Sequence, residues 1–316
     1  MRLIRYFKPG GPPDEPVCLA IGNFDGLHRG HQALIARTLA SELASGLMCF
    51  EPLPASYFRP DCPVQRITGV RDKVGMCRDL GLERMYLLRF DARLAGMSPE
   101  RFAADIVARA AGARQVVVGE DFRFGARAAG DVDSLRAFGA RFGFDVQVVA
   151  AVGDNGEPDS TDRISSSFVR QALAEGRLDR AERALGRAYR ISGRVLRGQA
   201  LGRKLGYPTV NLRPPVPPAL TGICAVRVHG AGLEGWPGVA SLGRRPTVAG
   251  SSWLLEVHLF DFDGDLYGRH LAVEFVAWIR HERKFDDLAA MTVQMNADAD
   301  LARRLLQPRK TGLETA

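Results

Sequence analysis

The sequence predicts two domains: an α/β domain with a parallel sheet in the first half, and a small antiparallel β-barrel with one terminal helix in the second. The 316 residues suffice for two domains of roughly 100–200 residues each. Short apolar runs alternate with helically spaced segments in the first half. The second half has short β-rich runs separated by glycine and proline. Gly186 is a suitable helix end, so we place the domains at residues 1–186 and 187–316.

Strands and helices alternate along the first half, which is typical of a parallel sheet covered by helices. The strands are expected at residues 17–21, 47–50, 85–90, 116–118 and 146–149. The helices are expected at residues 34–43, 70–80, 99–110, 132–142, 166–175 and 178–185. Ser98 is the expected N-cap of the third helix, because its hydroxyl can accept from a free N–H of the first turn.

The second half predicts a barrel because its apolar runs are short and turn residues separate them. Its strands are expected at residues 189–195, 223–228, 235–242, 254–260 and 271–278. One helix is expected at about residues 286–305, and residues 307–316 are expected to be disordered.

Composition favours a cytoplasmic protein that handles small phosphorylated ligands. Its 43 Lys and Arg exceed the 36 Asp and Glu, but no basic block stands out, so we expect no nucleic-acid partner. The five cysteines show no metal-ligand spacing, and their odd number argues against a disulfide framework. We expect no membrane partner, because no window holds the ~20 apolar residues of a membrane span and the N-terminus is no convincing signal peptide. Self-association cannot be read from the sequence.

The segment GNFDGLHRGH, residues 22–31, predicts a phosphate site because it follows a buried strand and opens a helix. Its glycines permit a tight turn, and a helix N-terminus presents free N–H groups to an anion. His28 and His31 are three residues apart and share a helix face, where they can donate to phosphate oxygens. The alternative is a glycine-rich turn with two surface histidines.

A second candidate site lies in GRVLRGQALGRKLGYPTVNL, residues 193–212. Glycines there suit a close approach to phosphate, and basic side chains supply charge: Gly198, Gly202, Arg203, Lys204 and Gly206. Thr209 and Asn211 are two apart, so in a strand they point the same way and their oxygens can ligate Mg²⁺. A polar turn with surface residues is an equally good interpretation of this segment alone.

Several segments of the first half together resemble the FMN adenylyltransferase module of prokaryotic bifunctional riboflavin kinase/FAD synthetases. These are the HxGH motif in residues 22–31, FEP with Pro54, VVGEDFRFG with Gly130-Asp131, and ISSSFVR in residues 164–170. The resemblance implies a Rossmann-like HxGH nucleotidyltransferase fold. The family often has FEPHPxEFF, where this chain has Leu53 and Ser56 in place of the His and the second acid.

The same resemblance implies roles for individual residues. His28 and His31 would be catalytic and stabilise the transferred phosphate. ATP would contact Gly22, Asn23, Phe24, Asp25, Gly26, Ser165, Ser166 and Arg170, and the flavin would face Asp121 and Phe122. Alternatively, Ser165 to Ser167 simply cap the helix that follows, a role that is compatible with phosphate binding, and Asp121 is a turn residue.

The second half resembles riboflavin kinases. PTVN at residues 208–211 is similar to their PTAN motif, and GICAVRV, GVASLGRRPT, LLEVHLFDFDGDLYG and IRHERKF follow in the family's order. The resemblance implies that Glu256 is the general base and that Thr209 and Asn211 hold Mg²⁺. It further implies phosphate contacts by Gly198, Gly202, Arg203, Lys204, Gly206 and Thr209, and flavin contacts by Arg280 and Phe285.

Together, the two resemblances imply a bifunctional enzyme. The barrel would phosphorylate riboflavin with ATP to give FMN, and the first domain would join FMN to AMP from a second ATP, giving FAD and pyrophosphate. Two alternatives remain open at this point. One is an ATP- or flavin-sensing regulator, and the other is a kinase whose adenylyltransferase half is inactive or redirected.

Overall fold

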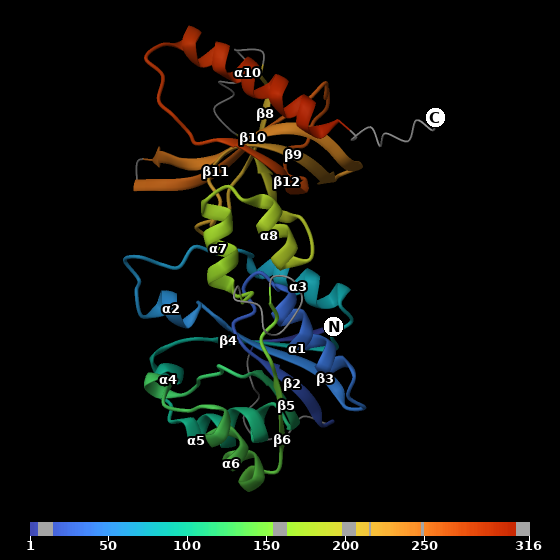
Figure 1. The fold of residues 1–316 in the computed structure, drawn as a ribbon, viewed down its shortest axis with the longest axis vertical. Helices are drawn as coiled ribbons and strands as arrows, with labels where there is room; N and C mark the ends of the chain where they lie inside the picture. Colours follow the sequence, from blue (N-terminus) through green and yellow to red (C-terminus); the bar gives the residue numbers. More distant parts are fainter. Residues whose placement is uncertain (6–14, 154–162, 198–206, 215, 248–249, 308–316) are drawn as a thin grey trace. The chain divides into compact units, whose positions relative to one another are not determined.

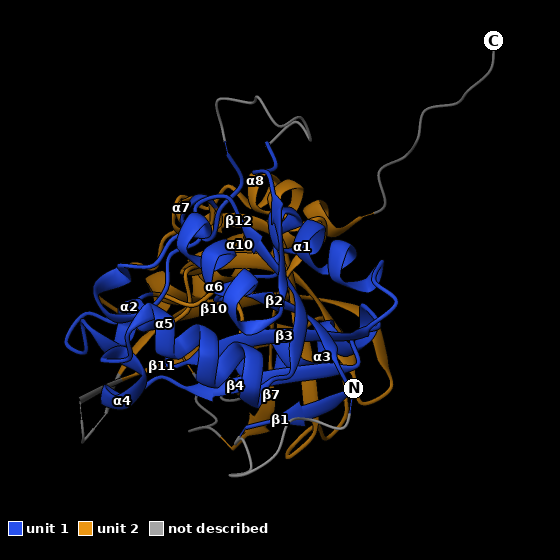
Figure 2. Ribbon diagram, turned by 90° about the horizontal axis from the view of Figure 1, so that it is seen from below, with its two compact units in different colours: residues 1–64, 70–168 blue, residues 65–69, 169–316 orange. Residues whose placement is uncertain are grey.

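The chain folds into two compact units, residues 1–64 with 70–168 and residues 65–69 with 169–316 (Figure 2). This computed structural model describes residues 1–5, 15–153, 163–197, 207–214, 216–247 and 250–307. The domain boundary at residue 186 stays a prediction. Among the described helices, none combines the length and the apolar character needed to span a bilayer.

The first unit is built on a parallel sheet of six strands, in the order β1-β4-β3-β2-β5-β6 (Figure 1). The strands are β1 (Arg2–Ile4), β2 (Val17–Ile21), β3 (Ala44–Glu51), β4 (Arg84–Arg89), β5 (Ala113–Gly119) and β6 (Asp145–Val149). The predicted parallel sheet is therefore confirmed. Strand β1 was not expected, because three residues are too few to show a period.

Helices cover both faces of this sheet, and alternate residues of β2 face each layer. Val17 and Leu19 pack in a core with η1 (Phe102–Ala110) and α6 (Val132–Phe142). Cys18 and Ala20 pack in the opposite core with α1 (Arg29–Leu39) and α3 (Val70–Asp79). Shorter helices are α2 (Pro54–Tyr57), α4 (Ala92–Ala95), α5 (Pro99–Arg101) and η2 (Ala126–Ala128).

Two predicted helices need correction. The helix expected at residues 34–43 is α1, which begins at Arg29 under the cap of His28 and ends at Leu39, with Ala40 as its C-cap. Leu39 and Leu43 are four apart and imitate a helical period, although Leu43 precedes strand β3. The helix expected at residues 99–110 begins as α5, with Ser98 as its N-cap, but residues 102–110 adopt π-helical pairing. Apolar spacing over nine residues does not separate the two kinds of helix.

The second unit contains a closed barrel in the order β10-β11-β8-β7-β12-β9, with antiparallel pairing throughout (Figure 1). Its strands are β7 (Tyr189–Leu196), β8 (Thr209–Leu212), β9 (Gly222–Gly230), β10 (Leu233–Thr247), β11 (Gly250–Leu259) and β12 (His270–Arg280). Leu212, Leu255 and Val257 are among the fully buried residues of its interior. The predicted barrel is confirmed.

Helix α10 (Leu288–Leu306) packs against β9, β10 and β12 through an apolar cluster that includes Ala299, Ala302 and Leu306. It begins two residues later than expected, because Asp287 caps it by accepting from the Ala290 N–H at 2.7 Å. Helix α7 (Ser166–Ala174) and helix α8 (Leu178–Leu185) precede the barrel, as predicted. Disorder was predicted for residues 307–316. Gln307 is described and is the C-cap of α10, and residues 308–316 lie outside the described residues.

Candidate active sites

The segment between β2 and α1 is held in an unusual backbone conformation. Gly26 has φ 89°, and the bulky residues Phe24 and Leu27 also have positive φ, 49° and 46°. A left-handed conformation costs a non-glycine residue roughly 1–2 kcal/mol. Phe24, Asp25, Gly26 and Leu27 are all buried, so surrounding packing keeps this conformation in place. Backbone strain of this kind clusters at functional sites.

His28 and His31 lie together at the N-terminus of α1. His28 is the N-cap, and its Nδ1 accepts a long hydrogen bond from the His31 N–H at 3.4 Å. The two imidazole rings stack with their centroids 3.6 Å apart, and the Phe24 ring lies 5.0 Å from that of His31. Stacking and the cap fix both rings beside the positive end of the helix dipole, where an anion is favoured.

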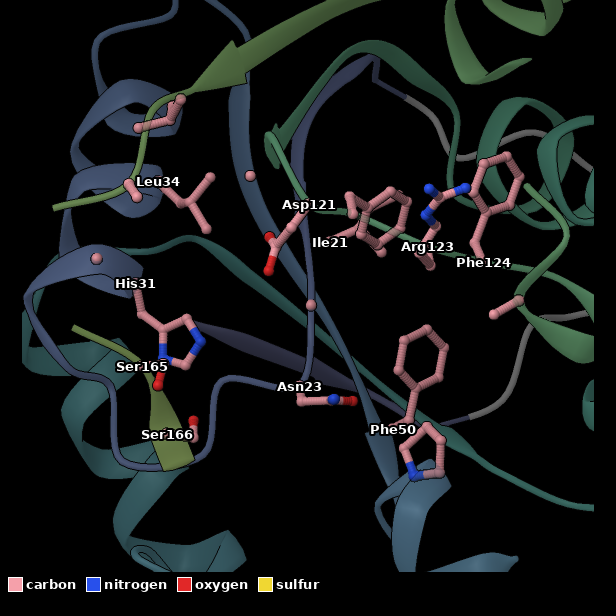
Figure 3. Close-up of a pocket in the computed structure, with 18 of the residues that line it drawn as sticks. Ile21, Asn23, His31, Leu34, Phe50, Asp121, Arg123, Phe124, Ser165 and Ser166 are labelled. Atoms are coloured by element: carbon pink, nitrogen blue, oxygen red, sulfur yellow. The ribbon is translucent and has the colours of Figure 1, made fainter. Parts of the chain in front are cut away.

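Both histidines line a cavity of about 560 Å³ in the first unit (Figure 3). Of the predicted ATP residues, Gly22, Asn23, Ser165 and Ser166 line it, and so do the predicted flavin residues Asp121 and Phe122. Phe24, Asp25 and Gly26 are buried beside this lining and do not belong to it. The structure thus brings together most of the residues predicted for this half.

The cavity has two chemically different sides (Figure 3). His31, Ser165 and Ser166 lie on one side, while Arg123, Phe124 and Phe50 lie on the other. Further lining residues add aromatic surface and positive charge: Phe58, Phe90, Phe102, Arg127 and Arg163. The histidine side suits phosphate, and the aromatic side suits a flat ring system that can stack.

Ser165 and Ser166 perform different structural tasks. Ser165 Oγ accepts from the Phe168 N–H at 3.1 Å, which is the capping role left open by the sequence. Ser166 Oγ donates to the Asp25 carbonyl at 2.9 Å and so ties helix α7 to the strained segment. Arg170 belongs to the second unit, where its Nε donates to the Gln65 carbonyl at 2.8 Å. Its assignment to ATP stays a prediction.

Sequence reasoning did not identify the aromatic wall of the cavity. Phe50, Phe58 and Phe90 come from separate segments and meet in edge-on contacts of 5.9–6.1 Å between ring centroids. Single phenylalanines carry no local signal of a shared wall. The two departures from the family pattern lie outside the lining, with Leu53 buried and Ser56 accepting from the Val64 N–H at 3.2 Å.

In the second unit, three predicted site residues meet on neighbouring strands. Asn211 of β8 is paired directly with Glu256 of β11, and Thr209 is paired with His258. Directly opposed residues and residues two apart share a face of a sheet, so Thr209, Asn211 and Glu256 point to the same side. This side is not the apolar interior, because the buried Leu255 and Val257 flank Glu256 and alternate with it.

Arg245 holds the Glu256 carboxylate through Nε at 3.2 Å and a terminal nitrogen at 3.0 Å. The same guanidinium donates to Glu282 at 2.8 Å and to Ser241 Oγ at 3.2 Å. Burial lowers the pKa of Arg245, but the hydrogen bonds and charges of Glu282 and Glu256 outweigh burial and raise it. Arg245 is therefore a fixed cation beside the predicted base. Sequence analysis assigned it no separate role.

For the other residues predicted in the kinase half, the structure gives less information about a role in binding. Arg280 forms a bidentate pair with the buried Asp298 of α10 and lies 5.9 Å from the Phe285 ring centroid. Their flavin contacts stay a prediction. The predicted phosphate residues Gly198, Gly202, Arg203, Lys204 and Gly206 lie outside the described residues. No cluster of three metal-ligating acidic, His or Cys side chains occurs within the described segments.

A parallel α/β unit with an HxGH helix start, followed by a barrel with a strand-borne carboxylate, defines a nucleotidyltransferase joined to a kinase. Residues 12–167 match the family model of FAD synthetase, and residues 185–306 match that of riboflavin kinase.

Relatives share this organisation over nearly the whole chain. The bifunctional riboflavin kinase/FMN adenylyltransferase of Pseudomonas fluorescens is 43% identical, covering 98% of this chain and 99% of that protein. The one of Escherichia coli K12 is 42% identical, covering 96% and 97%. A crystal structure from Streptococcus pneumoniae, described as a macrolide-efflux protein, matches with TM-score 0.78 at 27% identity, covering 96% and 99%. The chain belongs to the family of bifunctional riboflavin kinase/FMN adenylyltransferases, which are enzymes.

Proposed function

We propose that this chain makes FAD from riboflavin in two consecutive steps, one in each unit. The barrel transfers the γ-phosphate of ATP to the ribityl hydroxyl of riboflavin, and the first unit joins the resulting FMN to AMP. The observation that carries the second step is the cavity with stacked His28 and His31 on one side and an aromatic wall on the other. This arrangement supports a phosphate site over a glycine-rich turn with two surface histidines.

In the first step Glu256 accepts the proton of the ribityl hydroxyl as its oxygen attacks the γ-phosphate. Arg245 supports this role because its two contacts hold one carboxylate oxygen in place. The carboxylate would leave its other oxygen for the substrate. Positioning and electrostatic stabilisation supply most of the acceleration in phosphoryl transfer, so a base alone does not suffice.

In the second step the FMN phosphate is the nucleophile, and it attacks the α-phosphate of ATP while pyrophosphate leaves. This nucleophile is already an anion at neutral pH, so the site has to stabilise charge more than to remove a proton. His28 and His31 line the cavity at the N-terminus of α1, which supports that role for them. The aromatic wall with Phe122 would hold the flavin ring.

Magnesium fits the donors of the barrel site. Thr209 and Asn211 offer a hydroxyl and an amide oxygen on the face of Glu256, and Mg²⁺ combines few protein oxygens with substrate phosphates. The ion would neutralise phosphate charge and orient the transferred group. We also propose a cytoplasmic location and no nucleic-acid partner, in keeping with five cysteines that form no disulfide and with a sequence that has no basic block.

The test is to incubate the purified chain with riboflavin, ATP and Mg²⁺ and to separate the flavins by chromatography. FMN followed by FAD is the expected result, and omitting Mg²⁺ should stop both. FMN without FAD, even when FMN is supplied in excess, would favour a kinase with an inactive first unit. Neither product would contradict the proposal and favour a ligand sensor.

A further inference from the structure

Lys73 is a buried cation directly beneath the strained segment of the adenylyltransferase site. It lies on α3, its side chain is fully buried, and its Nζ donates to the Asn23 carbonyl at 2.8 Å. Asn23 lines the cavity, whereas Lys73 does not. The ammonium therefore reaches the site through the backbone and not through the ligand.

A buried ammonium is costly unless its surroundings compensate for the lost hydration. Here the hydrogen bond goes to a neutral carbonyl and not to a carboxylate. Burial and the neighbouring Cys49 raise the pKa of Cys77 to about 12, against the opposing effect of Lys73. Cys77 is consequently a neutral thiol at physiological pH, and it does not neutralise the ammonium.

The position of the anchored carbonyl explains why a cation is useful there. The Asn23 carbonyl belongs to the peptide unit that leads into Phe24, the first of the residues with positive φ. Leu27 also has positive φ, and His28 follows it as the cap of α1. Ser166 holds the same segment at the Asp25 carbonyl. Two hydrogen bonds from distant helices thus fix the path of the chain into the histidines.

We propose that Lys73 is a positioning residue of the adenylyltransferase site. Its ammonium anchors the Asn23 carbonyl, keeps the segment from Phe24 to Leu27 in its left-handed path, and thereby aligns His28 and His31 with the transferred phosphate. Its charge also adds a fixed positive field behind the phosphate side of the cavity. This inference rests on the proposed second step, adenylyl transfer to FMN.

The test compares Lys73→Met, which keeps the length without donor or charge, with Lys73→Gln, which keeps a donor without charge. Arg78→Met, an exposed site on the same helix, is the matched control. The measurements on the full chain are kcat and KM for FAD formation from FMN, the rate of FMN formation, and the midpoint of thermal unfolding.

We expect Lys73→Met to lower kcat for FAD formation at least tenfold, with KM values within about threefold of wild type, because misplaced catalytic groups lose rate. Lys73→Gln should fall between it and wild type. FMN formation and the control should be unchanged. The unfolding midpoint should change little, since Met loses one hydrogen bond but also removes the cost of burying a charge.

Two results would overturn the inference. One is a kcat for FAD formation within twofold of wild type in Lys73→Met. The other is a loss of activity that only parallels a lower unfolding midpoint, which would make Lys73 an ordinary core residue. If the Met variant does not fold, the same two criteria apply to the Gln variant. A wild-type chain that makes no FAD would instead contradict the proposed second step.

Discussion

His28 combines two tasks in one side chain: it caps helix α1 and presents an imidazole to the cavity. An N-cap is worth about 1 kcal/mol of stability, whereas a donor that stabilises developing charge is worth about 10²–10³ in rate. The two tasks can be separated because asparagine is a good cap that lacks the imidazole.

We therefore predict that His28→Asn keeps the stability of the chain and lowers FAD formation from FMN at least 100-fold. His28→Ala should lose both the activity and about 1 kcal/mol of unfolding free energy. Urea unfolding and a coupled pyrophosphate assay measure the two quantities. FAD formation near the wild-type rate in either variant would show that His28 is not a catalytic residue.

A substitution of Glu256 is expected to have a similarly specific effect, on the kinase reaction alone. Glu256→Gln preserves shape but cannot accept a proton, so FMN formation should fall by about 10²–10⁴-fold. FAD formation from supplied FMN should be unchanged. Glu234→Gln, at an exposed position of β10, is the matched control for both reactions. Unchanged kinase activity in Glu256→Gln would show that the base assignment is wrong.

At the scale of elements, helix α10 depends on its cap because the first turn is exposed. Leu288 is 62% exposed, and the Asp287 side chain accepts from the Ala290 N–H. Asp287→Ala should lower the free energy of unfolding by about 1 kcal/mol, and Asp287→Asn by only a few tenths. Chemical unfolding of the two variants beside wild type checks this. Equal stability of all three would mean that the cap contributes nothing.

Thiol reactivity reports on the burial of the strands and helices that carry the cysteines. Cys62 is exposed, and Cys18, Cys49, Cys77 and Cys224 are buried. Burial is the main reason that the pKa of Cys77 is raised from 9.0 to about 12, so the thiol is un-ionised in the folded state at pH 8.

At pH 8 we predict that a disulfide reagent titrates one thiol rapidly in the folded chain and all five in denaturant. The raised pKa of Cys77 also makes its contribution to stability complete below pH 9, and this contribution is lost as pH rises towards 12. Several fast thiols in the folded chain at pH 8 would contradict the burial of the other four cysteines.

The hydrophobic period and the turn residues were sufficient to predict the sheet, the barrel and the two histidines that line the cavity. Val17–Ile21 is an apolar run whose next residues are glycine-rich, so strand and turn were both readable. The strand β8 was suggested only by the spacing of Thr209 and Asn211. The π-helical pairing of residues 102–110 could not be predicted, because apolar spacing over nine residues does not distinguish a π-helix from an α-helix.

Long-range contacts could not be predicted from the sequence for a different reason. Lys73 and Asn23 are 50 residues apart, and Arg245 and Glu282 are 37 apart. The sequence around Lys73 and around Arg245 contains no local pattern that predicts the hydrogen-bond partner of either residue. The aromatic wall likewise assembles from single residues of several segments, so sequence analysis proposed only Asp121 and Phe122 for flavin binding in this unit.

The two reactions are divided between the two units of the molecule. The family ranges, residues 12–167 and 185–306, coincide with a parallel α/β unit and a barrel that each have their own core. FMN is the product of one unit and the substrate of the other. Two variants, each damaged in one unit, should therefore complement each other in solution.

The most direct measurement mixes His28→Asn with Glu256→Gln and follows flavins from riboflavin, ATP and Mg²⁺. His28→Asn alone should accumulate FMN, Glu256→Gln alone should leave riboflavin unchanged, and the mixture should form FAD. FAD from either variant alone at the wild-type rate, or no FAD from a mixture in which FMN accumulates, would contradict the division of the two reactions between the two units.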